Sequence, residues 1–259
     1  MSAPKPGARG LAPLLSKVLA TLVGNLYLVV GSLVFAVATI VMGWLPPRGR
    51  WALATARLWA AGVLLSSGVR LRVHRAAGFT PWASHVYLAN HQSLFDIPAL
   101  LRAVPGRFRF VAKESLFRIP IFGSALSAAG FISVDRGDRA AARQSFADAE
   151  RRLRSGGSVL LFPEGTRATA DVLLPFKRGG FLLALRTGLP IVPVGIRGTR
   201  AVQPRGRRTI QPGVVEVWFG EPIDVAQFGV RRKRELIAEV RRQLAGLAGV
   251  SPGELDEEA

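Results

Sequence analysis

Two long apolar stretches lie near the start of the chain, and a mixed pattern follows them. The thirty residues between Lys17 and Arg48 carry no charge. A helix of roughly 20 apolar residues is enough to cross the hydrocarbon core of a bilayer. A second apolar stretch, residues 51–69, contains one charge, at Arg57. We therefore expect residues 1–69 to form a membrane-associated segment with a pair of inserted helices.

Two arrangements of this segment fit the pattern. Either the first stretch spans the bilayer while the second lies along its surface, or the two form a hairpin that enters one leaflet and returns. Basic residues flank the pair on both sides, and cytoplasmic flanks are rich in Lys and Arg. These residues are Lys5, Arg9, Lys17, Arg70, Arg72 and Arg75. The symmetry favours a cell-membrane protein whose remaining part lies on the cytoplasmic side.

From residue 70 onward, short apolar runs alternate with helical patterns. The expected strands are residues 71–75, 85–90, 107–112, 130–134, 158–162, 190–196 and 214–219. The expected helices are residues 97–103, 120–128, 138–155, 178–187 and 231–247. Strands that alternate with helices indicate an α/β fold with a mixed, largely parallel sheet flanked by helices. We assign residues 70–250 to this domain and residues 251–259 to an acidic tail.

The charge of the chain indicates affinity for phosphate groups. Lys and Arg number 35 against 17 acidic residues, which gives a net charge of +18. No acidic residue precedes Asp96, so the basic, apolar N-terminal third favours a membrane surface over DNA. One non-enzymatic interpretation, a basic protein that binds a membrane surface or nucleic acid, rests on this charge alone. The absence of Cys excludes disulfides, thiolate metal sites and cysteine nucleophiles.

Polar clusters follow three of the expected strands, at residues 90–93, 135–136 and 163–167. In open α/β sheets, ligands bind where the strands end. If His91 lies in a loop and Asp96 opens the next helix, the carboxylate can accept from one imidazole nitrogen and leave the other free as a base. A structural alternative stays open, in which Asp96 caps the helix or forms a capping box with Ser93.

A second interpretation concerns two arginines. The guanidinium groups of Arg136 and Arg167 could clamp a phosphate, because their planar fork matches its oxygens. Without further evidence, the interpretation of both as solvated surface arginines, among thirty in the chain, is favoured. No GxSxG nucleophile motif is present. A His–Asp pair without a protein nucleophile indicates activation of a substrate hydroxyl for direct attack.

Four sequence blocks resemble those of the glycerolipid acyltransferases, in the same order and at similar spacing. NHQSLFD at 90–96 resembles their NHxxxxD block, and FPEGTR at 162–167 resembles their acceptor-binding block. GFISVDR at 130–136 and IVPV at 191–194 match the two others. Within this family the resemblance is greatest to 1-acyl-sn-glycerol-3-phosphate acyltransferases of the bacterial PlsC type, including the pair of N-terminal apolar segments.

This resemblance implies transfer of an acyl chain from acyl-CoA or acyl-carrier protein to the free sn-2 hydroxyl of 1-acylglycerol 3-phosphate. The product is phosphatidic acid for phospholipid synthesis. His91 is the implied base and Asp96 its partner, with no covalent acyl-enzyme, no metal, no cofactor and no nucleic-acid partner. The implied substrate-binding residues are Lys113, Arg136, Glu164, Gly165, Thr166 and Arg167.

One departure from the family pattern is Ala168, where Ser often follows the FPEGTR block. It leaves room for the same chemistry on another membrane lyso-lipid, such as a lyso-ornithine lipid or a lyso-glycolipid.

Overall fold

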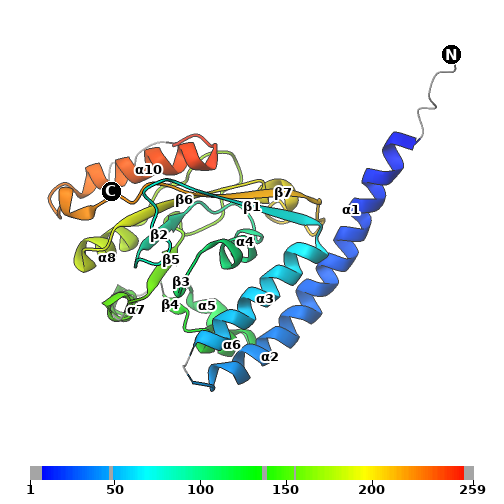
Figure 1. Cartoon of the computed structure of the whole chain (residues 1–259), viewed down its shortest axis with the longest axis horizontal. Coiled ribbons are helices and arrows are strands. Elements are labelled where there is room, and N and C mark those ends of the chain that lie inside the picture. Colours follow the sequence, from blue (N-terminus) through cyan, green and yellow to red (C-terminus); the bar gives the residue numbers. More distant parts are fainter. Residues whose placement is uncertain (1–7, 47–48, 136–138, 155, 254–259) are drawn as a thin grey trace, which may run out of the picture.

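A seven-stranded sheet forms the centre of the computed structural model, which describes residues 8–46, 49–135, 139–154 and 156–253 (Figure 1). The strands follow the order β1-β7-β6-β2-β5-β3-β4. Their bounds are β1 Val69–Arg75, β2 Val86–Ala89, β3 Phe108–Lys113, β4 Ile132–Val134, β5 Ser158–Leu161, β6 Ile191–Arg197 and β7 Gly213–Phe219. Neighbouring strands are parallel except β6 and β7, which are antiparallel. The sheet is therefore mixed and largely parallel, as the sequence predicts.

Helices cover both faces of this sheet (Figure 1). One face packs against α3 and α4, with α2 and α6 outside them, and the other packs against α7, α8 and α10. The bounds are α2 Ser32–Gly43, α3 Arg50–Ser66, α4 Asp96–Ala103, α6 Phe122–Ala128, α7 Arg139–Arg154, α8 Gly179–Thr187 and α10 Lys233–Ala248. Short elements are α5 Glu114–Phe117, α9 Thr199–Val202 and the 3-10 turn η2 Val225–Gln227.

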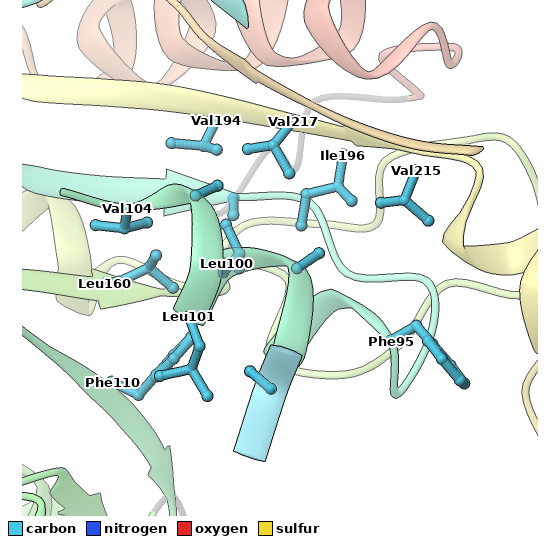
Figure 2. Packing of buried hydrophobic residues seen from close by; sticks show 14 of the residues in the cluster. Phe95, Leu100, Leu101, Val104, Phe110, Leu160, Val194, Ile196, Val215 and Val217 are labelled. Carbon is cyan, nitrogen blue, oxygen red and sulfur yellow. The ribbon is translucent and has the colours of Figure 1, made fainter. Parts of the chain in front are cut away.

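The core on the first face lies between α4 and the sheet. Figure 2 shows Leu100 of this helix region on the side of Val194 and Val217 of the strands, Val104 near Leu160, and Leu101 beside Phe110. All of these side chains are buried, and together with α3 they form one continuous hydrophobic cluster. Strands buried on both faces need nearly continuous apolar sequence, which β2 and β5 have. This packing fixes the start of α4, where Asp96 lies.

One long apolar helix runs along the outside of the first face. It consists of α1 (Ala8–Leu26), a π-helical turn η1 (Tyr27–Gly31) and α2. Small or partly polar positions such as Ala20, Gly24 and Thr39 face the body, while large apolar side chains on the opposite side are exposed. Within the described residues, Ala12–Gly43 is the one helix long and apolar enough to cross a membrane, by length and composition.

The predicted boundary between residues 69 and 70 falls one residue inside the first strand, since α3 ends at Ser66 and β1 begins at Val69. However, α3 contributes Leu53 and Val63 to the same core as the sheet. Segments 1–69 and 70–250 therefore pack against each other through α3. The predicted acidic tail pairs with the body at Ser251, and residues 254–259 lie outside the described part of the chain.

The seven predicted strands are confirmed, each within two residues at either end. The helix predicted over 120–128 begins only at Phe122 and is preceded by the separate helix α5. Pro120 lacks a backbone N–H and disfavours a helical conformation at the residue before it, and Ile121 follows with a φ of 64°. The turn at Pro120 and Ile121 therefore delays the start of the predicted helix by two residues, and the short helix α5 before it was not predicted.

Candidate active site

The predicted polar clusters lie at the carboxyl edge of the sheet. The NHQSLFD block follows β2, and FPEGTR begins at the end of β5, the neighbouring parallel strand. The cluster at 135–136 follows β4, which is separated from β5 by β3. Loops that leave adjacent parallel strands meet at one edge, so the first two blocks are in direct contact.

His91 and Asp96 form the predicted pair. The Nδ1 atom of His91 lies 2.6 Å from Oδ2 of Asp96, which is 0% exposed. The imidazole is 17% exposed, and its Nε2 atom has no hydrogen-bond partner within the described residues. Because an ionised carboxylate only accepts, Nδ1 carries the hydrogen and Nε2 keeps a free lone pair. The ring is therefore arranged as a general base.

Asp96 also makes one bond of the capping box that the alternative required, although no side-chain bond caps the first residue of α4. Its Oδ2 atom accepts from the backbone N–H groups of Gln92, at 2.8 Å, and Ser93, at 2.9 Å. Oδ1 is buried and has no hydrogen-bond partner in the described structure. The two interpretations of Asp96 are thus combined, because one oxygen holds the loop and the imidazole at the same time.

Two other side chains of this block fix its loop to neighbouring elements. The amide of Asn90 bonds both backbone groups of Ile196 in β6, at 2.7 and 3.0 Å. The hydroxyl of Ser93 donates to the carbonyl of Gln203 at 2.8 Å and accepts from the N–H of Phe95. Asn90 and Ser93 are both buried. Sequence analysis did not assign these roles, since each partner is more than 100 residues away along the chain.

The FPEGTR loop and the residue after it contact His91 through three residues, Phe162, Glu164 and Ala168. The ring of Phe162 stacks on the imidazole, with the ring centres 4.0 Å apart. The backbone N–H of Ala168 donates to the His91 carbonyl at 2.8 Å, and the His91 N–H donates to Oε1 of Glu164 at 2.8 Å. Position 168 therefore contacts the histidine through its backbone, while its methyl group is buried.

Glu164 is a second buried carboxylate, 3% exposed. Its Oε2 atom accepts from the N–H of Leu174 at 2.9 Å, so each oxygen holds one backbone donor. Burial raises the pKa of Glu164 to about 7, against the opposing effects of the Leu174 and His91 N–H groups. Glu164 was predicted as a substrate-binding residue; in the structure, both its oxygens hold the loop around His91.

The remaining predicted binding residues lie at the rim. Thr166 and Lys113 are exposed, Arg167 is half-buried, and Gly165 turns the loop with a φ of 74°. Such a φ favours glycine. Lys113 ends β3 opposite Val134 of β4, which places it two strands from the histidine loop. Arg136 lies outside the described residues.

This arrangement provides a base on a partly open edge, held by two buried carboxylates. It offers no nucleophilic side chain in contact with the imidazole among the described residues. Within the same residues, no three His, Asp or Glu side chains are placed to hold a metal ion. The chemistry it supports is proton abstraction from a bound hydroxyl. Such an arrangement is typical of general-base transferases and hydrolases.

Comparison with known proteins specifies the class further. Residues 70–197 match the family model described as acyltransferase. The chain is 33% identical over 175 residues to the 1-acyl-sn-glycerol-3-phosphate acyltransferases of Escherichia coli and Salmonella typhimurium, which covers 67% of this chain and 71% of each relative. It is 37% identical over 139 residues to a chloroplastic enzyme of that description from Brassica napus, of which it spans 40%.

The crystal structure of PlsC, the 1-acyl-sn-glycerophosphate acyltransferase of Thermotoga maritima, has the same fold. The TM-score is 0.75 at 26% identity, over 92% of this chain and 97% of that one. The chain belongs to the acyltransferase family, in the group of 1-acyl-sn-glycerol-3-phosphate acyltransferases. It is therefore an acyltransferase enzyme, and the interpretation as a purely basic binding protein is wrong.

Proposed function

We propose that the protein transfers an acyl chain from a thioester, either acyl-CoA or acyl-carrier protein, to the sn-2 hydroxyl of 1-acylglycerol 3-phosphate. The observation that carries this proposal is the 2.6 Å contact between His91 and Asp96, with the second imidazole nitrogen free. Nε2 takes the hydroxyl proton as the oxygen attacks the thioester carbonyl. The tetrahedral intermediate then expels the thiolate, which recovers the proton from the imidazolium. Asp96 stabilises the imidazolium between these two steps.

The acceptor phosphate is assigned to the basic groups at the rim. Arg167 follows the buried Glu164 by three residues, on a loop whose backbone is fixed to His91. A guanidinium there can form two parallel bonds to phosphate oxygens. Thr166, Gly165, Lys113 and Arg136 complete the proposed acceptor site. In this scheme Glu164 contributes by holding the loop that carries the others.

An apolar cavity beside the pair is assigned to an acyl chain. Its wall begins at Ile97, the residue after Asp96, and continues over α2, α3 and α6. The polar wall groups are already bonded within the protein: Ser32 accepts from the indole of Trp59, and the Thr39 hydroxyl donates to a backbone carbonyl. The cavity therefore offers a methylene chain an apolar surface without free hydrogen-bonding groups.

We also propose that α1 and α2 lie along a membrane surface rather than across it, with the body on the cytoplasmic side. Thr21 and Asn25, in the middle of the long apolar helix, bond the backbone of Ile210 and Arg208; Arg208 belongs to the exposed, basic loop 204–209, and buried Ile210 follows it directly. A spanning helix would carry that loop into the hydrocarbon core, where exposed arginines are costly. A helix in the interface places its apolar side in lipid and leaves the loop at the headgroups.

Vesicle flotation tests whether α1 and α2 insert into the membrane, and the intact chain is the appropriate sample because α3 is part of the core. The protein is expected to float with anionic vesicles at both low and high salt, since hydrophobic insertion is not screened by ions. Release by salt alone would contradict insertion of α1 and α2.

An acceptor screen tests the reaction. Purified protein in detergent is assayed with both donors against 1-acylglycerol 3-phosphate, a neutral monoacylglycerol and a lyso-ornithine lipid. Arg167→Ala should raise the KM for the phosphate acceptor by roughly 10-fold or more, because a charge-assisted hydrogen bond is worth about 1.5–3 kcal/mol. It should leave the KM for the neutral acceptor unchanged. Preference of the native protein for a lyso-ornithine lipid would reassign the acceptor, and equal defects on all acceptors would make Arg167 structural.

A further inference from the structure

A buried arginine on the last helix has no place in the mechanism above. Arg241 of α10 is 3% exposed, although most arginines of this chain are at the surface. It lies on the stripe of α10 that faces the sheet, on the face opposite the apolar N-terminal helix (Figure 1). The other buried members of that stripe are Leu236, Ile237, Val240, Leu244, Ala245 and Ala248. A charge in such a position is retained only where specific bonds compensate its desolvation.

Two hydrogen bonds and a ring contact of Arg241 go to one short segment, residues 173–176. Its Nη2 atom donates to the carbonyl of Leu173 at 2.9 Å, and Nη1 donates to the carbonyl of Leu174 at 3.1 Å. Its guanidinium also lies over the ring of Phe176, 4.8 Å from the ring centre. The same segment is paired with the end of the chain, since the Leu173 N–H donates to the Ser251 carbonyl at 2.9 Å. Leu174 is thus fixed by α10, and its neighbour Leu173 is fixed by both α10 and Ser251.

Leu174 connects this contact to the active site. Its carbonyl accepts from Arg241, while its N–H donates to Oε2 of Glu164 at 2.9 Å. The other oxygen of Glu164 accepts from the His91 N–H at 2.8 Å. A continuous series of hydrogen bonds therefore runs from α10 through Leu174 and Glu164 to the backbone of the histidine. It begins outside residues 70–197, the part of the chain that matches the family model.

We propose that Arg241 is a positioning residue for acyl transfer, which fixes Leu174 so that Glu164 holds the backbone of His91 in the reactive position. The inference rests on the proposed function, because it concerns how the base of that reaction is held. Arg241 does not touch the reacting atoms; it acts through Leu174 and Glu164.

The charge of Arg241 adds an electrostatic effect of known sign. The charged groups that act on Glu164 are Asp96 and Arg241, and the backbone N–H groups of Leu174 and His91 donate to it. Burial is the largest influence on its pKa and raises it, Asp96 raises it further, and the N–H bonds and Arg241 lower it. A protonated carboxyl presents one oxygen as a donor, which weakens its hold on two N–H groups. Loss of Arg241 should therefore shift the acid limb of the activity profile to higher pH.

The experiment compares Arg241→Met with Arg241→Lys and the matched control Arg197→Met. Arg197 also bonds two carbonyls, those of Gly246 and Leu247 at the end of α10, but contacts neither Leu173 nor Leu174. Full-length proteins in detergent are assayed for kcat and acceptor KM between pH 5.5 and 9. Arg241→Met should lower kcat roughly two- to fivefold at pH 8 and more at pH 6. Its acceptor KM should be unchanged, and Arg241→Lys should restore the position of the acid limb.

A double-mutant cycle with Glu164→Gln separates positioning from general destabilisation. In the Glu164→Gln background, Arg241→Met should cause no further loss and no shift of the limb, since the connection is already broken. The proposal would be overturned if the kcat losses of Arg241→Met and Glu164→Gln multiplied in the double variant. It would also be overturned if Arg197→Met lost as much kcat and shifted the acid limb as far as Arg241→Met. If Arg241→Met does not fold, the same cycle is run with Arg241→Lys, whose smaller loss should vanish in that background. A native enzyme inactive on every acceptor would instead refute the proposed function.

Discussion

The loops 90–96 and 162–168 each bring one buried carboxylate to His91, but they use it in different ways. Asp96 collects three donors on Oδ2, namely the imidazole and two backbone N–H groups, and leaves Oδ1 without a partner in the described structure. Glu164 places one backbone donor on each oxygen. The first carboxylate touches the group whose charge changes in the reaction, whereas the second touches only the backbone.

This difference decides what an amide replacement does at each position. An Asn at 96 can keep its carbonyl oxygen on all three donors and place its NH₂ where Oδ1 now has no partner, so it removes the charge and keeps the geometry. A Gln at 164 must direct its NH₂ at either the His91 or the Leu174 N–H, so it breaks one bond. The two substitutions therefore test charge and position separately.

The largest effect is expected for His91→Ala, which removes the group that both carboxylates serve. Activity should fall by roughly 10² or more, because general-base assistance is lost. The backbone N–H of residue 91 remains to bond Glu164, so circular dichroism and thermal melting should stay close to those of the native protein. If His91→Ala kept half of the native activity, His91 would not be the general base, and the two carboxylates could not be compared by how they serve it.

Asp96→Asn should come next. Loss of a charge-assisted bond to the imidazolium is worth about 1.5–3 kcal/mol, which corresponds to a kcat reduced roughly 10- to 150-fold. Acceptor KM and melting temperature should change little, because the loop bonds are kept. Asp96→Ala serves as the matched variant that breaks those bonds as well, and it should also lower the melting temperature. Near-normal turnover in Asp96→Asn would mean that Asp96 only caps the helix.

Glu164→Gln should have the smallest effect, roughly fivefold in kcat at pH 8, the size of one net hydrogen bond of about 1 kcal/mol. Its diagnostic is pH. The folded pKa of Glu164 is about 7, raised from 4.5, so the stability it contributes is complete below about pH 4.5 and lost as pH rises through about 7. The activity of the native protein should rise over the same pH range, because ionised Glu164 accepts from both the His91 and the Leu174 N–H groups.

The measurement is the difference in melting temperature between Glu164→Gln and the native protein at pH 5.5 and pH 8.5. Relative to the native protein, Glu164→Gln should melt at a higher temperature at pH 8.5 than it does at pH 5.5. At pH 8.5 only the native protein carries a buried charge at position 164. A difference that is independent of pH would contradict the raised pKa and reduce Glu164 to a passive loop contact.

Local patterns predicted the parts of the site that are local. The spacing of His91 and Asp96, the helix start at Asp96 and the strand ends before both loops follow from short-range preferences and are confirmed. The antiparallel pairing of β6 with β7 was not predicted, because pairing direction depends on which strands become neighbours. The loop-holding role of Glu164 was missed for the same reason, since it depends on contacts to residues 91 and 174.

Arg241 did leave a signal in the sequence. The apolar periodicity of residues 231–247 predicts α10, and an arginine four residues after Ile237 and three before Leu244 interrupts the stripe that faces the sheet. Periodicity shows that such a residue is on the buried side. It does not show that the partners are the carbonyls of Leu173 and Leu174, which lie almost 70 residues earlier.

The bond between Thr21 and Ile210 has a consequence for the time course of synthesis. These residues are separated by 189 positions, and bacterial and eukaryotic ribosomes add roughly 5–20 residues per second. The apolar helix therefore leaves the ribosome roughly 10–40 s before the loop that covers its inner side exists. Throughout that interval, Thr21 and Asn25 lack the backbone partners at Ile210 and Arg208, whereas α3 follows the helix directly in the chain and contacts it much sooner. The proposed insertion into the membrane can therefore take place during synthesis, before the catalytic edge of the sheet is complete.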